Sequence, residues 1–341
     1  MEARTTPNPA PSTSLGAETP SPRPRVDSQK GRALAAAITR AASKQTYYTV
    51  RFLVDKNLVD DAFRAYAYFR WLDDRLDQET LPWTERLALV QRQQALMEDG
   101  YSGQLLADLT PEEQLLADLI QRDKEKDSGL QAYVRNMMAV MVFDANRRGQ
   151  LVSQRELDEY THWLAIAVTE AVHHFIGNDC VSPHDETRYL AATGAHIAHM
   201  LRDAAEDAEA GYYNLPRELV AARGIDPREV ESEAYRDWVQ ERVQVARACF
   251  RAGRRYMARV ESLRCRIAGY AYINRFEIVL DCIEREGYLL RADYSERKGR
   301  RRGMGMIGRT LWMALNFRQQ PGAAAELYSS RAVAAALKEV S

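Results

Sequence analysis

The chain has little cysteine, no long apolar run and almost no net charge. Its 341 residues include four cysteines without C-x-x-C spacing, which argues against a zinc knuckle or a disulfide framework and favours a reducing compartment. Apolar runs such as residues 137–143 fall far short of the ~20 residues that a membrane-spanning helix needs. The formal net charge of −1 gives no long-range attraction for nucleic acid. We therefore expect a soluble, cytoplasmic protein that makes at most peripheral contact with a membrane.

Large apolar residues are also scarce in residues 1–30, where Pro, Ser and Thr are frequent. Such a segment buries too little apolar surface to offset the entropy of ordering, so it is predicted to be a disordered tail. It lacks the apolar core of a secretory signal, and Glu2 and Glu18 argue against a transit peptide. Residues 31–341 are expected to form one domain.

The rest of the chain has the pattern of helices. Ala, Leu, Arg, Glu and Gln dominate, proline is sparse, and apolar residues recur every three or four positions. No alternating strand pattern persists and no internal repeat is present, which predicts an all-α fold. The expected helices cover roughly residues 31–54, 58–78, 82–98, 111–122, 129–148, 153–177, 184–209, 226–261 and 263–289.

Two of these predicted helices carry polar stripes on an otherwise apolar background. In the helix at 58–78, spacings of four, three and four residues place one set on a single face: Tyr66, Arg70, Asp73 and Asp77. In the helix at 184–209, spacings of three, four and four residues do the same for a second set: His196, His199, Asp203 and Asp207. Either stripe alone is also compatible with a solvated helix face.

Together the stripes suggest a site for a cation and an anion. Carboxylates one turn apart repel each other, and burial strengthens that repulsion, so a cation is expected between them. Carboxylate oxygens offered from two helices suit Mg²⁺, which keeps several waters and is usually completed by a substrate phosphate. Arginines would hold the same diphosphate, and the chemistry would be ionisation of an allylic diphosphate to a carbocation.

The sequence of both stripes resembles that of a known family. "AYAYFRWLDDRLD" (65–77) and "MLRDAAEDAEAGYYNLPREL" (200–219) resemble the two aspartate-rich signatures of the squalene/phytoene synthase family. Further similar segments are residues 43–53, 143–165 and 270–290. The resemblance implies an isoprenoid-synthase-type helical bundle with a central active-site cavity, a prenyl diphosphate donor and Mg²⁺. The metal ligands that it implies are Asp73, Asp74, Asp77, Asp203 and Asp207, and the diphosphate contacts or their supports are Thr46, Tyr66, Arg70 and Arg202.

Besides Thr46 and Phe276, which stand where the family has serine and tyrosine, four departures from the family pattern bear on the acceptor. His196 and His199 stand where the family has glutamine and asparagine, and imidazole is a poor Mg²⁺ ligand beside oxygen donors. Ile166 and Thr169 stand where the family has glycines, so the cavity is expected to be narrower. The second metal site would have fewer oxygen ligands, and the cavity would have less room for a second prenyl chain. Both departures favour an acceptor other than a second prenyl diphosphate.

The leading hypothesis is transfer of one prenyl group, from dimethylallyl to geranylgeranyl in length, to an aromatic acceptor. The resemblance extends to a sub-family that prenylates aromatic acceptors, which implies a carbazole-type or indole-type small molecule of secondary metabolism. The new carbon–carbon bond requires a base to remove the ring proton, and the candidates are His196, His199 and Glu170. Tyr160, with Trp163, would line the acceptor pocket.

Three alternatives stay open. The first is head-to-head condensation of two prenyl diphosphates, as in phytoene or squalene synthesis. The second is a catalytically inactive relative that serves as a scaffold or assembly protein. The third is a zinc hydrolase site at His196, His199 and Asp203, although histidines three residues apart differ from the four-residue spacing of helical zincins.

Overall fold

A computed structural model describes residues 28–104, 106–230, 232–291, 294, 310 and 313–314. These residues form eleven α-helices, where nine were predicted, and no β-strand, which confirms the all-α class. The first six are α1 (Ser28–Ala42), α2 (Lys44–Leu53), α3 (Val59–Leu76), α4 (Trp83–Tyr101), α5 (Pro111–Arg122) and α6 (Gly129–Arg147). The remaining five are α7 (Gln154–Phe175), α8 (Leu190–Ala210), α9 (Arg217–Arg223), α10 (Glu233–Arg259) and α11 (Leu263–Arg285). None of the described helices is long and apolar enough to cross a membrane.

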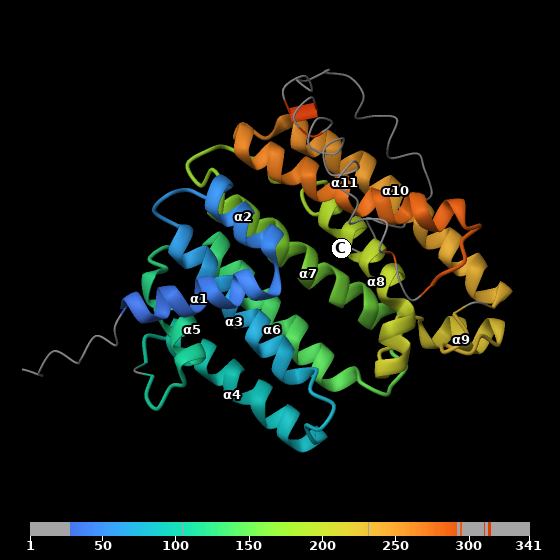
Figure 1. Cartoon of the computed structure of the whole chain (residues 1–341), viewed down its shortest axis with the longest axis horizontal. Helices are drawn as coiled ribbons and strands as arrows, with labels where there is room; N and C mark the ends of the chain where they lie inside the picture. Colours follow the sequence, from blue (N-terminus) through green and yellow to red (C-terminus); the bar gives the residue numbers. More distant parts are fainter. Residues whose placement is uncertain are drawn as a thin grey trace, which may run out of the picture.

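The two central helices, α7 and α8, run through the middle of the bundle (Figure 1). Helices α1 and α3 to α6 lie on one side of them, the α10–α11 pair lies on the other side, and α2 contacts both α3 and α11. Helix α3 packs on α6, α6 packs along α7, and α7 packs on α8. The helices that carry the two polar stripes, α3 and α8, are therefore connected through the α6–α7 pair.

Several helix ends differ from the predicted ones. The expected helix at 31–54 is two helices, because the backbone is extended at Ser43, whose hydroxyl accepts a hydrogen bond from the Thr46 N–H at 3.1 Å and caps α2. The expected helix at 226–261 begins only at Glu233, after the cap residue Ser232. Helix α8 begins at Leu190 rather than near residue 184. Helix α1 begins at Ser28, inside the predicted tail, whose residues 1–27 lie outside the described residues.

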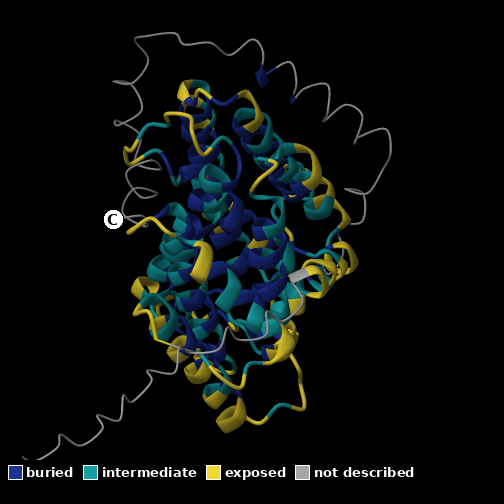
Figure 2. Cartoon of the chain, turned by 90° about the vertical axis from the view of Figure 1, so that its left-hand side faces the viewer, coloured by how far each residue is buried: buried dark blue, intermediate teal, exposed yellow. Residues whose placement is uncertain are grey.

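The buried side chains form the interior of the bundle, and exposed residues lie mainly on outer faces and loops (Figure 2). One large apolar cluster is built mainly from α3, α5 and α6, and includes Tyr68, Leu72 and Leu116. A second cluster joins α8, α10 and α11, and includes Leu201, Phe250 and Leu280. The polar stripe of α8 therefore belongs to a helix that is anchored by its other faces.

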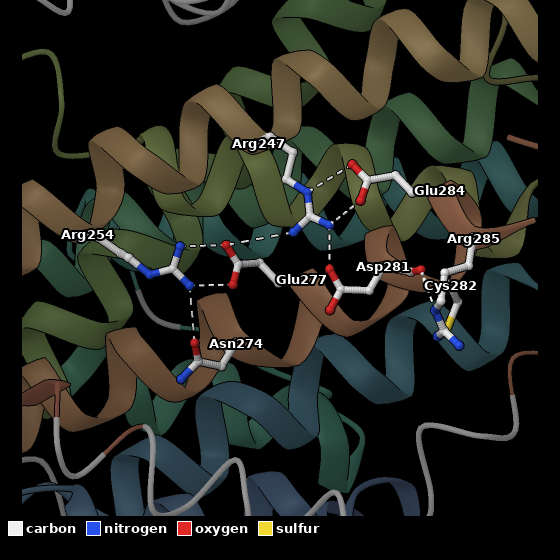
Figure 3. A network of polar contacts seen from close by, with 8 residues as sticks. All are labelled: Arg247, Arg254, Asn274, Glu277, Asp281, Cys282, Glu284 and Arg285. Atoms are coloured by element: carbon white, nitrogen blue, oxygen red, sulfur yellow. Dashed lines mark hydrogen bonds and ion pairs between the residues drawn. The ribbon is translucent and has the colours of Figure 1, made fainter. Parts of the chain in front are cut away.

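A polar network joins α10 to α11 beside this second cluster (Figure 3). Arg254 pairs with Glu277 and donates a hydrogen bond to Asn274 at 3.2 Å. Arg247 donates to Glu284 at 2.7 Å and to Asp281 at 2.5 Å. These ion pairs set the register between the two helices, which places one face of α11 against α8.

Candidate active site

The first polar stripe lies on the last three turns of α3 and ends at the C-cap residue Asp77. Arg70 contacts Asp73 at 3.3 Å and also pairs with Asp74. Tyr66, one turn before Arg70, is half-buried on the same face. Burial and the nearby charge of Asp77 raise the pKa of Asp73 to about 7. The acids of this stripe thus repel one another, and Arg70 lies beside them.

A third helix adds a carboxylate that the sequence reasoning missed. Asp144, near the end of α6, accepts a hydrogen bond from the Tyr160 hydroxyl at 3.1 Å and pairs with Arg147 at 2.7 Å. After burial, its charge is the largest cause that raises the pKa of Asp77, and it also acts on Asp73. Asp144 therefore lies close to the α3 acids.

The second stripe, on α8, has a different environment at each aspartate. Asp203 pairs through both oxygens with Arg202, and His199 Nδ1 lies 3.4 Å from it. Asp207 accepts a hydrogen bond from the Asn214 side-chain amide at 2.8 Å. Burial raises the pKa of Asp207 to about 6, against the lowering effect of the Asn214 hydrogen bond, and the charge of Asp203 adds to the rise.

A buried arginine connects the acids of α6 and α8. Arg147 donates to Asp144 and, at 2.9 Å, to the side-chain oxygen of Asn214, which in turn binds Asp207. Its guanidinium also lies over the rings of Tyr160 and Tyr212, 5.0 and 5.2 Å from their centroids. The segment 212–216, between α8 and α9, thus also supplies polar contacts to the site.

The two histidines of α8 differ in exposure. His196 is buried, with its Nδ1 atom 3.2 Å from the Thr161 hydroxyl and its ring edge-on to Tyr160. Burial, together with the nearby charges of His199 and Arg147, lowers the pKa of His196 well below its ordinary value, so this imidazole is neutral at physiological pH. His199 is half-exposed, and its Nε2 atom lies 2.7 Å from Arg202.

The third base candidate, Glu170, is part of an ion pair. Both of its oxygens accept hydrogen bonds from Arg188, at 2.7 and 2.8 Å, and one accepts a further bond from Tyr189 at 2.9 Å. Burial would raise the pKa of Glu170, but these bonds outweigh it, and the pKa is lowered. Glu170 also lies ten residues, or roughly 15 Å of helix rise, beyond Tyr160. This geometry favours a structural role for Glu170 over that of a base.

The other predicted substrate contacts occupy two helices. Thr169 is buried and Ile166 is half-buried on α7, between Tyr160 and Glu170 along the helix. Thr46 is half-buried in the first turn of α2, and its hydroxyl donates to Ser43 at 2.9 Å. Their contacts with a substrate stay predictions.

The carboxylates that the resemblance assigns to the metal are oxygen donors of the kind that Mg²⁺ prefers, but they are not already assembled into a metal site. In the described part of the chain, no three acidic, histidine or cysteine side chains come close enough together to hold one metal ion. The charge of Asp144 on α6 nevertheless helps to raise the pKa values of Asp73 and Asp77 on α3 and of Asp207 on α8, so a cation near these acids would relieve their repulsion.

Two solved structures have the same fold. Squalene synthase HpnC from Alicyclobacillus acidocaldarius matches with a TM-score of 0.63 and 21% identity, over 78% of this chain and 97% of that one. A dehydrosqualene synthase solved in complex with a ligand matches with a TM-score of 0.64 and 17% identity, over 83% of this chain and 96% of that one. At these identities the similarity establishes the fold, an isoprenoid-synthase-type helical bundle.

The family is established by sequence comparison. A comparison with curated proteins finds no match. The family model described as squalene/phytoene synthase, in contrast, matches residues 39–302, which include all the helices that carry the site. The chain therefore belongs to the squalene/phytoene synthase family, whose members are prenyltransferases.

Proposed function

We propose that this enzyme transfers the prenyl group of an allylic prenyl diphosphate to an aromatic small molecule of the carbazole or indole type. The donor would lie between dimethylallyl and geranylgeranyl diphosphate in length. The observation that carries the proposal is that Asp144 of α6 acts on acids of both α3 and α8, where Arg70 and Arg202 pair with further acids of the same two helices. Acids and arginines of this kind suit a diphosphate bound partly through divalent ions.

Mg²⁺ is the ion that these donors would hold. It is usually bound by one or two carboxylates together with waters and substrate phosphates, so it does not require a cage of protein ligands. Asp73, Asp77 and Asp207 are the best candidates because burial and neighbouring acids act on all three. Asp74 and Asp203 pair with arginines, and their role as ligands is a prediction. When bound, the ion would neutralise charge on the departing diphosphate.

The proposed reaction breaks the bond between the allylic carbon and the diphosphate oxygen, and the electron pair leaves with the diphosphate. Arg70 and Arg202 stabilise the charge that develops on this leaving group. The allylic cation then bonds to a carbon of the electron-rich ring, which becomes a strongly acidic arenium ion. Its proton passes to a base, for which the neutral, buried His196 has the required protonation state.

An aromatic wall supports an aromatic acceptor. Phe143 stacks on Tyr160 with their centroids 4.8 Å apart, and Trp163 meets Phe143 edge-on at 6.2 Å. Tyr160 also contacts both Asp144 and His196, so this wall adjoins the acids and the proposed base. A flat ring would stack on such a surface.

Head-to-head condensation of two prenyl diphosphates is the second candidate. It is favoured by the comparisons, because both solved structures described above carry the names of enzymes that make squalene or dehydrosqualene. It requires a cavity that holds two prenyl chains. The side chains of Ile166 and Thr169, which replace glycines of the family pattern, would narrow that cavity.

A screen of donors against acceptors tests the proposal. The purified enzyme is incubated with Mg²⁺ and dimethylallyl, geranyl, farnesyl or geranylgeranyl diphosphate, each with and without a hydroxycarbazole or an indole. We expect an acceptor mass increased by one prenyl group, and at least about a hundredfold less product from Asp73→Asn. A hydrocarbon formed from the donor alone would instead establish head-to-head condensation. Absence of diphosphate release from every donor would indicate an inactive scaffold.

A further inference from the structure

Three arginines close to the candidate site have carboxylate partners. Arg70 pairs with Asp73 and Asp74, and Arg202 pairs with Asp203. The buried Arg147 pairs with Asp144 in the same way, at 2.7 Å. Each of these cations is therefore largely neutralised before any ligand binds.

Arg275 on α11 is different. Among the residues that the structure describes, it has no hydrogen bond or ion pair, although its side chain is half-buried. Its guanidinium carbon lies 5.6 Å from the centroid of the neighbouring Phe276 ring. A half-buried guanidinium without a protein acceptor leaves its donors available to a ligand or to water.

The location of Arg275 connects it to the diphosphate site. It shares one face of α11 with Tyr272, Phe276 and Val279, at the three- and four-residue spacing that stacks side chains on a helix. Phe276 on this face meets the ring of His199 with the centroids 6.2 Å apart. His199 contacts Arg202, so the face points toward the stripe of α8.

The electrostatics agree with this placement. Burial is the main cause that lowers the pKa of Arg275, and the positive charge of Arg202 is the next. The Tyr66 side chain of α3 acts on Arg275 as well, so the guanidinium lies within the field of both stripe-bearing helices. Two like charges held near each other, one of them unpaired, indicate a missing anion.

We infer that Arg275 binds the diphosphate of the prenyl donor directly, as a third arginine beside Arg70 and Arg202. The inference rests on the proposed function, and it names a residue of α11 that the sequence motifs do not single out. A planar guanidinium suits this role because it can donate two parallel hydrogen bonds to phosphate oxygens. Arg275 is less suited to the part of the site that would hold the aromatic acceptor, because a cation there would repel the carbocation.

Binding of inorganic pyrophosphate to the full-length protein tests the inference without any prenyl transfer. Isothermal titration with Mg²⁺ present is carried out on the wild type, Arg275→Gln, Arg275→Lys and the control Arg285→Gln. Arg285 lies on the same helix, is exposed, and donates to the backbone oxygen of Asp281 at 2.9 Å. It is outside the proposed site.

We expect Arg275→Gln to weaken pyrophosphate binding by about tenfold or more, since a hydrogen bond to a charged group exceeds one tenfold step in affinity. Arg275→Lys should lie in between, because an ammonium cannot donate in the same forked geometry. Arg285→Gln should bind as the wild type does. The melting temperature of Arg275→Gln should stay equal or rise, because an unpaired charge that repels Arg202 is removed.

Affinity within twofold of the wild type in both Arg275 variants would overturn the inference, as would a wild type that binds no pyrophosphate. A melting temperature lowered by several degrees in Arg275→Gln with unchanged affinity would assign the residue to folding instead. The proposed function fails separately, if the screen of donors and acceptors yields no prenylated product while pyrophosphate binding still depends on Arg275.

Discussion

Asp144 has the widest influence of any single residue in the candidate site. It contributes to the raised pKa values of Asp73, Asp77 and Asp207, which belong to two different helices. It also holds Arg147, and through it the segment after α8. A negative charge at the end of α6 therefore completes the acidic set that would attract divalent ions.

Replacement of this carboxylate should reduce catalysis more than stability. For Asp144→Asn we expect kcat/KM for prenyl transfer to fall by about a hundredfold, because one preorganised charge is removed from the site. Unfolding should become easier by about 1 to 3 kcal/mol, because Arg147 loses a charged partner. Steady-state assays and urea titrations measure the two effects. Asp179→Asn, at an exposed position in a loop, is the control, and equal activities of the two variants would contradict this role.

At the scale of elements, the position of α8 depends on two glycines. A Cβ atom at Gly194 of α8 would lie 2.9 Å from the Cβ of Cys249 on α10. A Cβ atom at Gly253 of α10 would lie 2.7 Å from the Cβ of Ala191 on α8. The two helices therefore approach as closely as glycine permits, and this contact sets the position from which α8 presents His196 and Asp203.

Gly253→Ala should force the two helices apart. Alanine has the higher helix propensity, by up to about 1 kcal/mol, but overpacking costs about 1 to 3 kcal/mol, so we expect a net loss of stability. Gly31→Ala in α1 is the matched control, because its added methyl group would meet only Leu115 at 4.0 Å and should be neutral or stabilising. Thermal unfolding of both variants provides the measurement. If Gly253→Ala were as stable as Gly31→Ala, the contact between α8 and α10 would have space for an added methyl group, and the argument would be wrong.

At the scale of the whole molecule, a polar network ties together the first helices of the bundle. Glu113 of α5 accepts hydrogen bonds from Arg92 and Gln93 of α4, at 2.7 and 2.8 Å. Gln93 in turn accepts a bond from Tyr68 of α3 at 3.0 Å. Burial would raise the pKa of Glu113, but the bonds from Arg92, Gln93 and the Thr110 backbone lower it to about 2.

This lowered pKa makes part of the global stability depend on pH. The folded pKa of Glu113 lies below its unfolded value, so its contribution is complete above about pH 4.5 and is lost as the pH falls toward 2. Glu113→Gln should destabilise the protein by about 1 to 3 kcal/mol at pH 7, and the difference from the wild type should shrink below pH 4.5. Urea unfolding at pH 7 and pH 3.5 measures this. The control is Glu112→Gln, at a position without an ion pair among the described residues, and a pH-independent difference for Glu113→Gln would contradict the argument.

Much of this structure could be predicted from the amino-acid sequence because helices depend on neighbours three and four residues apart. That local rule was enough for the all-α class, for most helix positions, and for the shared face of Tyr66, Arg70 and Asp73 on α3. The break at Ser43 is local as well, since serine is a common cap residue, but the apolar pattern continues across it and predicts one long helix. The family signatures were recognisable for the same reason, as both are continuous segments of single helices.

Only the tertiary structure decided which charges meet. The pairing of Glu170 with Arg188, the position of Asp144 among acids of other helices, and the lack of a described partner for Arg275 all depend on packing between distant segments. Charge state follows the same contacts, because desolvation and neighbouring charges set a pKa, and neither can be read from spacing along one helix. The periodic pattern specified which side chains share a face, and the packing of the helices determined what each face encounters.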